Sequence, residues 1–381
     1  MDGKTILVTG GLGQVGLSII QRLQDQYPTC QIHVIDLSTP TTNRDLRYFP
    51  NVTYHKGTIT DKTFIRNVFV ESTPLVVFHT AGLIPQIAQR LDMDSEKHYI
   101  KVNVEGTRNV LDAAREVGSV RAFVYTSSAD VVKSHSWVDL VNVDESVPVP
   151  EEFDHSYAKS KALAESLVLT SSTSPFPTTA LRTHAVIGPF DTNILPLFLS
   201  APRNIHLGPG TNLYDFTYAP NLALAHDLAA RNLLTTTSAT TTTTTTSTAG
   251  DRNRGFESAA GKPFFITNGD PLPFRSVVEM IHAAFTSGAE TSSTTNQGSI
   301  TIPITIAYVL TWVVEKVCQM LGKRPMLSTR DLGDSVSQRW FDNSAARRVV
   351  GYEPRVKLAE GVREMVEEYR RVRKWREGSS S

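Results

Sequence analysis

The sequence predicts an α/β protein built on a doubly wound parallel sheet, with a smaller mixed lobe in the C-terminal half. Three observations predict it. Short apolar, β-branched runs alternate with helical stretches, the first run ends in a glycine-rich turn, and the regular pattern loosens after about residue 183. Such alternation favours a parallel sheet that is covered on both faces, whose strands are nearly continuous in apolar residues. At 381 residues the chain is long enough for two lobes.

The elements follow in chain order. Residues 5–9 (TILVT) are a strand, residues 14–26 have helical spacing and residues 31–36 (QIHVID) are a second strand, which together make a βαβ unit. Further strands are expected at 52–56, 75–80, 122–127, 178–182 and 263–267, and further helices at 61–71, 96–118 and 221–234. We therefore divide the chain into a cofactor-binding domain, 1–183, and a substrate lobe, 184–381, that is interleaved with the first sheet.

Two polar stretches interrupt the second lobe. Residues 235–250 (TTTSATTTTTTTSTAG) contain nothing with which to build a core and are expected to be a disordered surface insertion. Residues 286–299 are a second loop rich in Ser and Thr. We expect no chemistry from either stretch.

Composition excludes several functions. Lys and Arg number 38 and Asp and Glu number 38, so the chain lacks the basic surplus of a nucleic-acid binder. Cys30 and Cys318 are the only cysteines and lie far apart, which predicts neither a disulfide framework nor a cysteine metal site. The N-terminus runs directly into the first strand with no secretory hydrophobic region, so we expect an intracellular protein in a reducing compartment.

A phosphate cradle is expected where the first strand turns into the first helix, at residues 9–16 (TGGLGQVG). Gly10, Gly13 and Gly16 allow a tight turn and let backbone amides, including those of Gln14 and Val15, approach a pyrophosphate at the positive end of the helix dipole.

Asp36 ends the second strand about twenty residues after this turn, which is the usual distance for such a motif. A carboxylate there accepts hydrogen bonds from a ribose 2′-hydroxyl and repels a 2′-phosphate. The cofactor is therefore predicted to be NAD rather than NADP. The alternative is that Asp36 merely caps a loop.

Tyr157 and Lys161, in YAKSK, are four residues apart and share one face of a helix. A positive charge beside a phenol favours the phenolate and lowers a pKa that is ordinarily about 10, which predicts a proton-transfer site. An ordinary amphipathic helix is the commoner explanation of an isolated pair. The context adds weight, because Ser127 and Ser128 follow a strand at the sheet edge where ligands bind, although serines there also cap the next element.

Together TGGLGQVG, Asp36, HTAG at 79–82, VNVEGTRNVL at 102–111, YTSS and YAKSK resemble an extended short-chain dehydrogenase/reductase with a Rossmann sheet. Within that group the chain is most similar to the 3β-hydroxysteroid dehydrogenase/isomerase branch, and particularly to the decarboxylating sterol-4α-carboxylate 3-dehydrogenases. The closer match lies in residues 215–221, 261–274 and 339–362. The resemblance covers almost the whole chain apart from the two polar stretches.

The resemblance implies that Tyr157 is the acid/base, that Lys161 holds the nicotinamide ribose and that Ser128, or its neighbour Ser127, steadies the substrate oxygen. Ala81 and Gly82 join the cofactor-binding residues. The implied reaction is NAD-dependent oxidation of a 3β-hydroxyl on a sterol or triterpenoid, with loss of a 4α-carboxylate as carbon dioxide and with no metal.

The chain departs from that pattern at two points. Thr58 stands where the family usually has an aspartate beside the adenine, and Ala219-Pro220 replaces a valine and a polar residue before Asn221.

Within an apolar segment at residues 302–321, the uncharged run 302–314 is too short to span a bilayer, and both a packed helix and a membrane-surface helix fit the segment. Tyr308 and Trp312 suit an interface, with Lys323 and Arg324 as headgroup partners. The resemblance implies the cytosolic face of the endoplasmic reticulum, with the cytoplasm as the alternative. The expected partners are a sterol or triterpenoid, a membrane surface and a second copy in a homodimer, without nucleic acid.

Two other functions stay open. A reductase or epimerase of soluble substrates, such as nucleotide sugars or flavonoid-like ketones, uses the same three side chains, although the apolar segment speaks against it. A non-catalytic cofactor-binding regulator is the second alternative, although such a protein need not keep the serine, tyrosine and lysine side chains together. Within the steroid branch, a housekeeping sterol enzyme and a triterpenoid-tailoring enzyme are both open.

Overall fold

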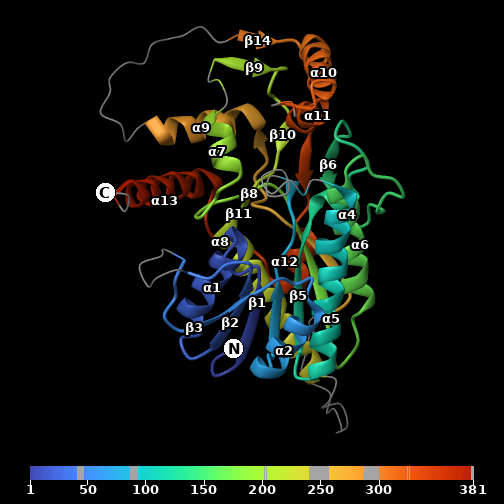
Figure 1. Ribbon diagram of the computed structural model, residues 1–381, viewed down its shortest axis with the longest axis vertical. Helices are drawn as coiled ribbons and strands as arrows, with labels where there is room; N and C mark the ends of the chain where they lie inside the picture. The colour runs from blue at the N-terminus through green and yellow to red at the C-terminus, as the bar shows by residue number, and fades with distance from the viewer. Residues whose placement is uncertain are drawn as a thin grey trace, which may run out of the picture.

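A seven-stranded parallel sheet in the order β12-β7-β5-β4-β1-β2-β3 forms the centre of the protein (Figure 1). The structure is a computed structural model that describes residues 1–40, 47–85, 93, 95–200, 202, 204–239, 257–286, 300–323, 325 and 327–378. The strands of this sheet are β1 (Thr5–Thr9), β2 (Gln31–Asp36), β3 (Val52–Lys56), β4 (Val76–His79), β5 (Ala122–Ser128), β7 (Thr178–Thr183) and β12 (Pro263–Ile266). The predicted doubly wound parallel sheet is confirmed.

Helices cover both faces of this sheet, which explains why central strands such as β1 and β4 are buried on both faces. One face packs on α1 (Gln14–Gln26), α8 (Ala219–Ala239) and α12 (Ser344–Val350). The other packs on α2 (Lys62–Ser72), α5 (Gly106–Val117) and α6 (Ser156–Thr170). In β1, Ile6 and Val8 point to the first layer and Leu7 to the second, and all three are fully buried.

The expected helix at residues 96–118 consists of three parts: α4 (Glu96–Tyr99), a π-helical segment η1 (Ile100–Glu105), and α5. Gly118, with φ +68°, ends α5 in the left-handed conformation that glycine favours. After β5 the chain forms a short 3-10 turn, η2 (Ala129–Val132). This turn leads into the loops above the carboxyl ends of the strands.

The second lobe lies above that edge (Figure 1). Its strands are β6 (Leu140–Val143), β8 (Val186–Ile187), β9 (Ile205–Leu207), β10 (Leu213–Tyr214), β11 (Thr217–Tyr218), β13 (Leu272–Pro273), β14 (Ile300–Ile302) and β15 (Arg339–Phe341). Its helices are α7 (Ile194–Ser200), α9 (Phe274–Thr286), α10 (Ile304–Met320), α11 (Thr329–Val336) and α13 (Leu358–Gly378). A separate apolar core joins α7, α9 and α13.

The two polar stretches lie mostly outside the described residues, namely 240–250 and 287–299. The helix before the first stretch is longer than expected, because α8 continues to Ala239. Thr235 and Thr236 donate hydroxyl hydrogen bonds to the carbonyl oxygens of Arg231 and Asn232, at 3.0 and 2.9 Å. These bonds satisfy the threonine hydroxyls within the helix.

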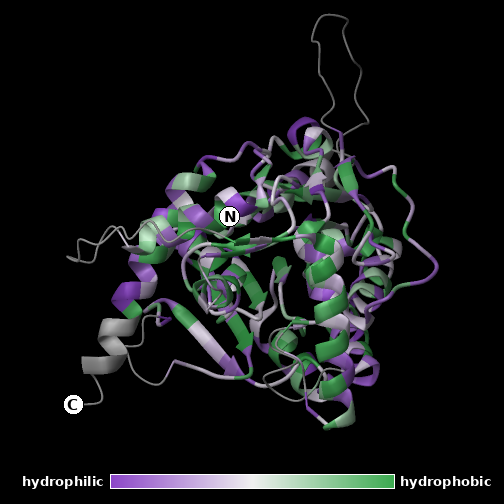
Figure 2. Ribbon diagram, turned by 90° about the horizontal axis from the view of Figure 1, so that it is seen from above, coloured by the Kyte–Doolittle hydropathy of each residue, from purple (hydrophilic) through white to green (hydrophobic). Residues whose placement is uncertain are grey.

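The apolar segment forms α10, whose side chains are mainly exposed. Trp312 is 48% exposed and Met320 78%, whereas the buried residues of this helix are Ala307 and Thr311. Figure 2 looks down on this end of the molecule, where hydrophobic colours run along the helix. Among the described residues, no helix is both long enough and apolar enough to cross a membrane.

Candidate active site

One large cavity runs along the carboxyl edge of the main sheet and on between the lobes. Its volume is about 2120 Å³, which exceeds the ~300–1,000 Å³ typical of a pocket for one small ligand. The residues predicted for the site all line it: Gly10, Gly13, Gln14, Val15, Gly16, Asp36, Ala81, Gly82, Ser128, Tyr157 and Lys161. The cavity is large enough for a dinucleotide and a second ligand together.

The glycine turn is shaped by close backbone approach. Gly10 has φ +68°, and a Cβ on it would lie 2.7 Å from the Cα of Ala81. A Cβ on Gly16 would collide with the carbonyl of Gly10. Gly13 precedes α1 without a side-chain cap and no acidic residue stands in the first turn, which leaves the helix N-terminus suited to an anion.

Asp36 is fixed beside this turn. Its Oδ2 accepts a hydrogen bond from the amide of Leu12 at 3.0 Å, and its Oδ1 accepts one from the amide of Ser38 at 3.3 Å. Each oxygen keeps a lone pair for a ribose hydroxyl. Thr58 also lines the cavity, but its hydroxyl is engaged by Thr60, at 3.0 Å between the Oγ1 atoms.

The two serines at the end of β5 point to different partners. Ser128 lies near enough to Tyr157 for its side chain to lower the pKa of the phenol. The Oγ of Ser128 accepts from the amide of Asp130 at 3.1 Å, so its own proton is free for the phenol oxygen. Ser127 donates instead to the buried Glu165, at 2.6 Å. The structure therefore places Ser128, and not Ser127, beside the tyrosine.

Tyr157 begins α6, which is capped by His155. The His155 Nδ1 accepts from the amide of Tyr157 at 2.9 Å, and the two rings meet edge to face. Burial raises the pKa of Tyr157, the negative charge of Asp130 raises it further, and the side chain of Ser128 works in the opposite direction. As a phenolate, Tyr157 is therefore a strong base.

Lys161 lies one turn further along α6 and is buried. Its Nζ donates to the carbonyl of Thr126 at 2.6 Å and lies 4.3 Å above the ring of Tyr125. Burial lowers the pKa of Lys161 to about 7, although the charge of Glu165 opposes this. The sequence-based expectation that Lys161 lowers the pKa of Tyr157 is wrong here, because burial dominates and the ammonium group faces Thr126.

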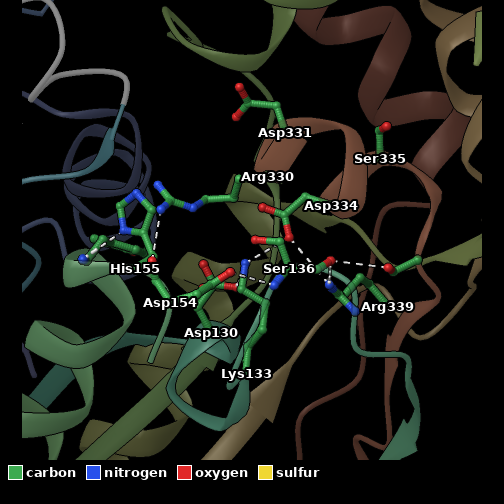
Figure 3. A network of polar contacts seen from close by, with 12 residues as sticks. Asp130, Lys133, Ser136, Asp154, His155, Arg330, Asp331, Asp334, Ser335 and Arg339 are labelled. Atoms are coloured by element: carbon green, nitrogen blue, oxygen red, sulfur yellow. Dashed lines mark hydrogen bonds and ion pairs between the residues drawn. The ribbon is translucent and has the colours of Figure 1, made fainter. Parts of the chain in front are cut away.

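Sequence reasoning missed a polar network that lines the same cavity (Figure 3). The Nζ of Lys133 lies 3.2 Å from Asp130 Oδ1 and 3.0 Å from Asp334 Oδ1. Arg339, 1% exposed, lies 3.4 Å from the same Asp334 oxygen. Burial opposes both charges of the first pair, but Lys133 lowers the pKa of Asp130 and the two acids raise that of Lys133. The pair is therefore ionised.

Asn103 is a second residue that the sequence analysis missed. It lies in the π-helical segment η1, and its side chain accepts from the amide of Leu83 at 2.6 Å and donates to the Leu83 carbonyl at 3.0 Å. It also donates to Ser160 on α6 at 2.9 Å. It thereby fixes the loop after Gly82 against α6, and π-helical turns are frequent at functional sites.

No three His, Cys, Asp or Glu side chains gather in a metal-binding arrangement within the part of the chain that the structure describes.

Comparison with known proteins identifies relatives along nearly the whole chain. The family model for the 3-beta hydroxysteroid dehydrogenase/isomerase family matches residues 7–295. The decarboxylating sterol-4-alpha-carboxylate 3-dehydrogenase of Schizosaccharomyces pombe is 36% identical over 369 residues, covering 95% of this chain and 96% of that protein. The Saccharomyces cerevisiae enzyme of the same name is 32% identical over 367 residues, with 94% and 95% covered.

Among solved structures, the Bordetella bronchiseptica enzyme WbmH in complex with NAD+ has a TM-score of 0.67 at 18% identity, covering 97% of this chain and 99% of that one. The dTDP-glucose 4,6-dehydratase of Bacillus anthracis in complex with NAD has a TM-score of 0.66 at 18% identity, with 98% of each chain covered. These likenesses establish the fold.

Proposed function

The chain belongs to the 3-beta hydroxysteroid dehydrogenase/isomerase family, and we propose that it uses NAD to oxidise the 3β-hydroxyl of a sterol or triterpenoid, after which a 4α-carboxylate leaves as carbon dioxide. The observation that carries the proposal is that Ser128, Tyr157, Lys161 and the glycine turn line one cavity. The names of relatives that match over nearly their full length support the substrate class.

The residues that would hold NAD are the glycine turn, Asp36, Ala81, Gly82 and Lys161. When bound, NAD accepts a hydride from the carbinol carbon. Ser128 holds the substrate oxygen, and Tyr157 removes its proton. Lys161, one helical turn further along α6, would hold the nicotinamide ribose.

The same two side chains serve the loss of carbon dioxide. Oxidation turns the substrate into a β-keto acid, in which the bond to the carboxylate breaks and its electron pair moves to the ketone oxygen. Tyr157, protonated in the first step, returns that proton to the enolate oxygen, while Ser128 steadies it. The enol then becomes the ketone.

To test this, the purified protein is incubated with NAD and a 3β-hydroxysteroid that either carries or lacks a 4α-carboxylate. The formation of NADH and of carbon dioxide is measured. Tyr157→Phe should lower kcat by about 10²- to 10⁴-fold, the usual range for a general acid/base. Tyr48→Phe, outside the cavity, is the matched control. If Tyr157→Phe keeps activity within a few-fold, Tyr157 is not the base.

The other outcomes separate the remaining functions. NADH without carbon dioxide from the carboxylate would leave a dehydrogenase that does not decarboxylate. Inactivity on every steroid would favour a soluble substrate or a regulatory role.

Membrane binding through α10, on the cytosolic face of the endoplasmic reticulum, is part of the same proposal. Support comes from the exposed apolar side chains of the helix and from Lys323 just beyond it. Arg324, the other expected headgroup partner, lies outside the described residues. The cavity is also lined by Glu315 of α10 and by Pro325 and Leu327, which follow the helix. The homodimer stays a prediction, and light scattering of the purified chain tests it.

A further inference from the structure

Two cations in the cavity, Lys133 and Arg330, have no part in the chemistry described so far. Both line the cavity that Ser128 and Tyr157 also line. They come from segments about two hundred residues apart, the loop after β5 and helix α11 of the second lobe. Figure 3 shows Lys133 beside Asp130 and Asp334, and Arg330 reaching toward Asp154 and His155. Each is tied by hydrogen bonds to a segment that flanks the catalytic pair.

Lys133 is held close to Ser128. Its Nζ contacts Asp130, whose amide donates to the Ser128 oxygen at 3.1 Å. The Lys133 side chain is 7% exposed, and its second partner is Asp334. An ammonium group has three N–H donors, so two acceptors leave one donor for a ligand.

Arg330 is held close to the start of the catalytic helix. Its Nη2 donates to the carbonyl of Asp154 at 2.9 Å, and Asp154 precedes His155, which caps the helix of Tyr157. The guanidinium group pairs with no carboxylate among the described residues. The adjacent Asp331 instead accepts from the amide and hydroxyl of Ser328, at 2.9 and 2.7 Å, and is turned away (Figure 3).

The carboxylates nearest to Arg330 in the cavity lining, Asp331 and Glu315, accept hydrogen bonds from Ser328 and Thr329 rather than from Arg330. Asp130 and Asp334 compensate Lys133 and Arg339, which are the buried cations of the network. Arg330 is exposed to the cavity with its charge unpaired and with spare N–H donors. An anion between Lys133 and Arg330 would accept hydrogen bonds from the spare N–H donors of both side chains. A planar carboxylate matches the geometry of a guanidinium group.

We propose that Arg330 and Lys133 bind a carboxylate carried by the substrate next to the carbon that is oxidised. This rests on the proposed function, which places the substrate oxygen between Ser128 and Tyr157. A carboxylate on the neighbouring ring carbon would lie within a few ångströms of that oxygen, in the cavity that Lys133 and Arg330 both line. Lys133 is the fixed partner of the carboxylate and Arg330 the mobile one. The pair selects carboxylated over neutral sterols and orients the 3β-hydroxyl.

The test compares two steroid substrates of nearly equal shape, a 3β-hydroxysteroid with a 4α-carboxylate and its uncharged 4α-carboxamide. Arg330→Gln should lower kcat/KM for NADH formation from the carboxylate about tenfold, the loss expected for one charge-assisted hydrogen bond in a partly solvated site. For the carboxamide, kcat/KM should change less than about threefold. Arg330→Glu should lower kcat/KM for the carboxylate further. Arg330→Lys should retain part of the preference for the carboxylate over the carboxamide. Arg363→Gln, an exposed arginine on α13 outside the cavity, is the matched control.

Two further readouts sharpen the result. Raising the salt concentration should raise KM for the carboxylate in the unaltered protein and much less in Arg330→Gln, because salt screens the interaction. Lys133→Gln should lower kcat/KM for the carboxylate by about ten- to hundredfold. Lys133→Gln leaves Asp130 without its cationic partner, so circular dichroism is used to check that this variant folds. If it unfolds, the Arg330 variants alone decide whether the carboxylate site exists.

A proportional fall on both substrates, or no fall on either, would overturn the carboxylate site. Inactivity of the unaltered protein on both steroids would reject the proposed function instead, so the two failures are distinguishable.

Discussion

At the scale of single residues, Lys161 illustrates a conflict between stability and function. The lysine is 6% exposed, and the partners of its ammonium group are the Thr126 carbonyl and the face of the Tyr125 ring. Burial without a close carboxylate disfavours the charged form, which is why its pKa falls to about 7. The protein therefore tolerates a destabilising side chain at the position where the proposed reaction needs a cation.

Lys161→Met should abolish NADH formation and yet stabilise the fold. The unfolded pKa is about 10.4, so the unfolded state binds more protons than the folded state between pH 7 and that value, and stability rises with pH across this window. The destabilisation of the fold by Lys161 is therefore at its maximum below pH 7. We expect the variant to gain at least about 1 kcal/mol in urea unfolding at pH 6, and less at pH 9.

Lys159→Met, an exposed lysine on the same helix, is the control and should change neither quantity strongly. A loss of stability in Lys161→Met at pH 6 would contradict the argument.

The signals that predicted the site residues are local. Glycine spacing and the Tyr157–Lys161 interval lie within single turns of chain, and the structure brings those residues to one cavity. The choice between Ser127 and Ser128 was not local, because both serines meet α6, Ser127 at Glu165 and Ser128 near Tyr157, and sequence spacing does not tell which meets which. The Lys133–Asp334 contact joins residues far apart in sequence, and no spacing rule signals it.

At the scale of elements, strands were predicted better than helix interiors. The bounds expected for β1, β2 and β3 agree with the structure, because apolar runs end there at turns. The π-helical segment η1 inside the expected helix was missed. Its cause is tertiary, since Asn103 hydrogen-bonds Leu83 and Ser160, and a helical pattern of apolar residues carries no trace of those bonds.

Helix α10 should bind membranes through its exposed apolar side chains. Replacing Val309, Trp312 and Val313, which are 57%, 48% and 45% exposed, by serine removes apolar area that would otherwise enter a lipid surface. We expect flotation with liposomes of zwitterionic and anionic lipid to fall at least about tenfold, since burying even one such side chain contributes roughly 1.5–3 kcal/mol. NADH formation from detergent-dispersed substrate should be unchanged.

The control replaces three exposed apolar residues scattered over other elements, Val70, Val141 and Leu163, by serine. It should float like the unaltered chain. Equal flotation of the α10 variant, or no flotation of the intact protein, would end the membrane proposal.

At the scale of the whole molecule, the two halves of the chain share their layers. Helix α8, from the second half, packs on α1, where Arg22 lies 2.6 Å from Asp227. Strand β12 returns to pair with β7, and β6, from the first half, pairs with β15. A boundary at residue 183 follows from the loss of periodicity, but sequence pattern does not reveal that later segments return to the first sheet. The division into domains therefore stays a proposal about function rather than about separate folding.

Because of this sharing, the protein should unfold in one transition that NAD shifts as a whole. All four tryptophans follow residue 136, so their fluorescence reports mainly on the second lobe, whereas far-UV circular dichroism reports on all helices. At a hundred times its Kd, NAD contributes about 2.7 kcal/mol, which at ~2.1 cal/mol/K per residue raises Tm by about 3–4 °C for a chain of this length. Both probes should report the same shift in Tm. Two separate transitions, or a shift seen by circular dichroism alone, would show that the lobes unfold independently.

NADP at the same concentration should raise Tm less than NAD does, because the Asp36 carboxylate repels its 2′-phosphate. Asp36→Ala should narrow the difference between the two Tm shifts. Equal shifts by NAD and NADP in the unaltered protein would reject the role of Asp36.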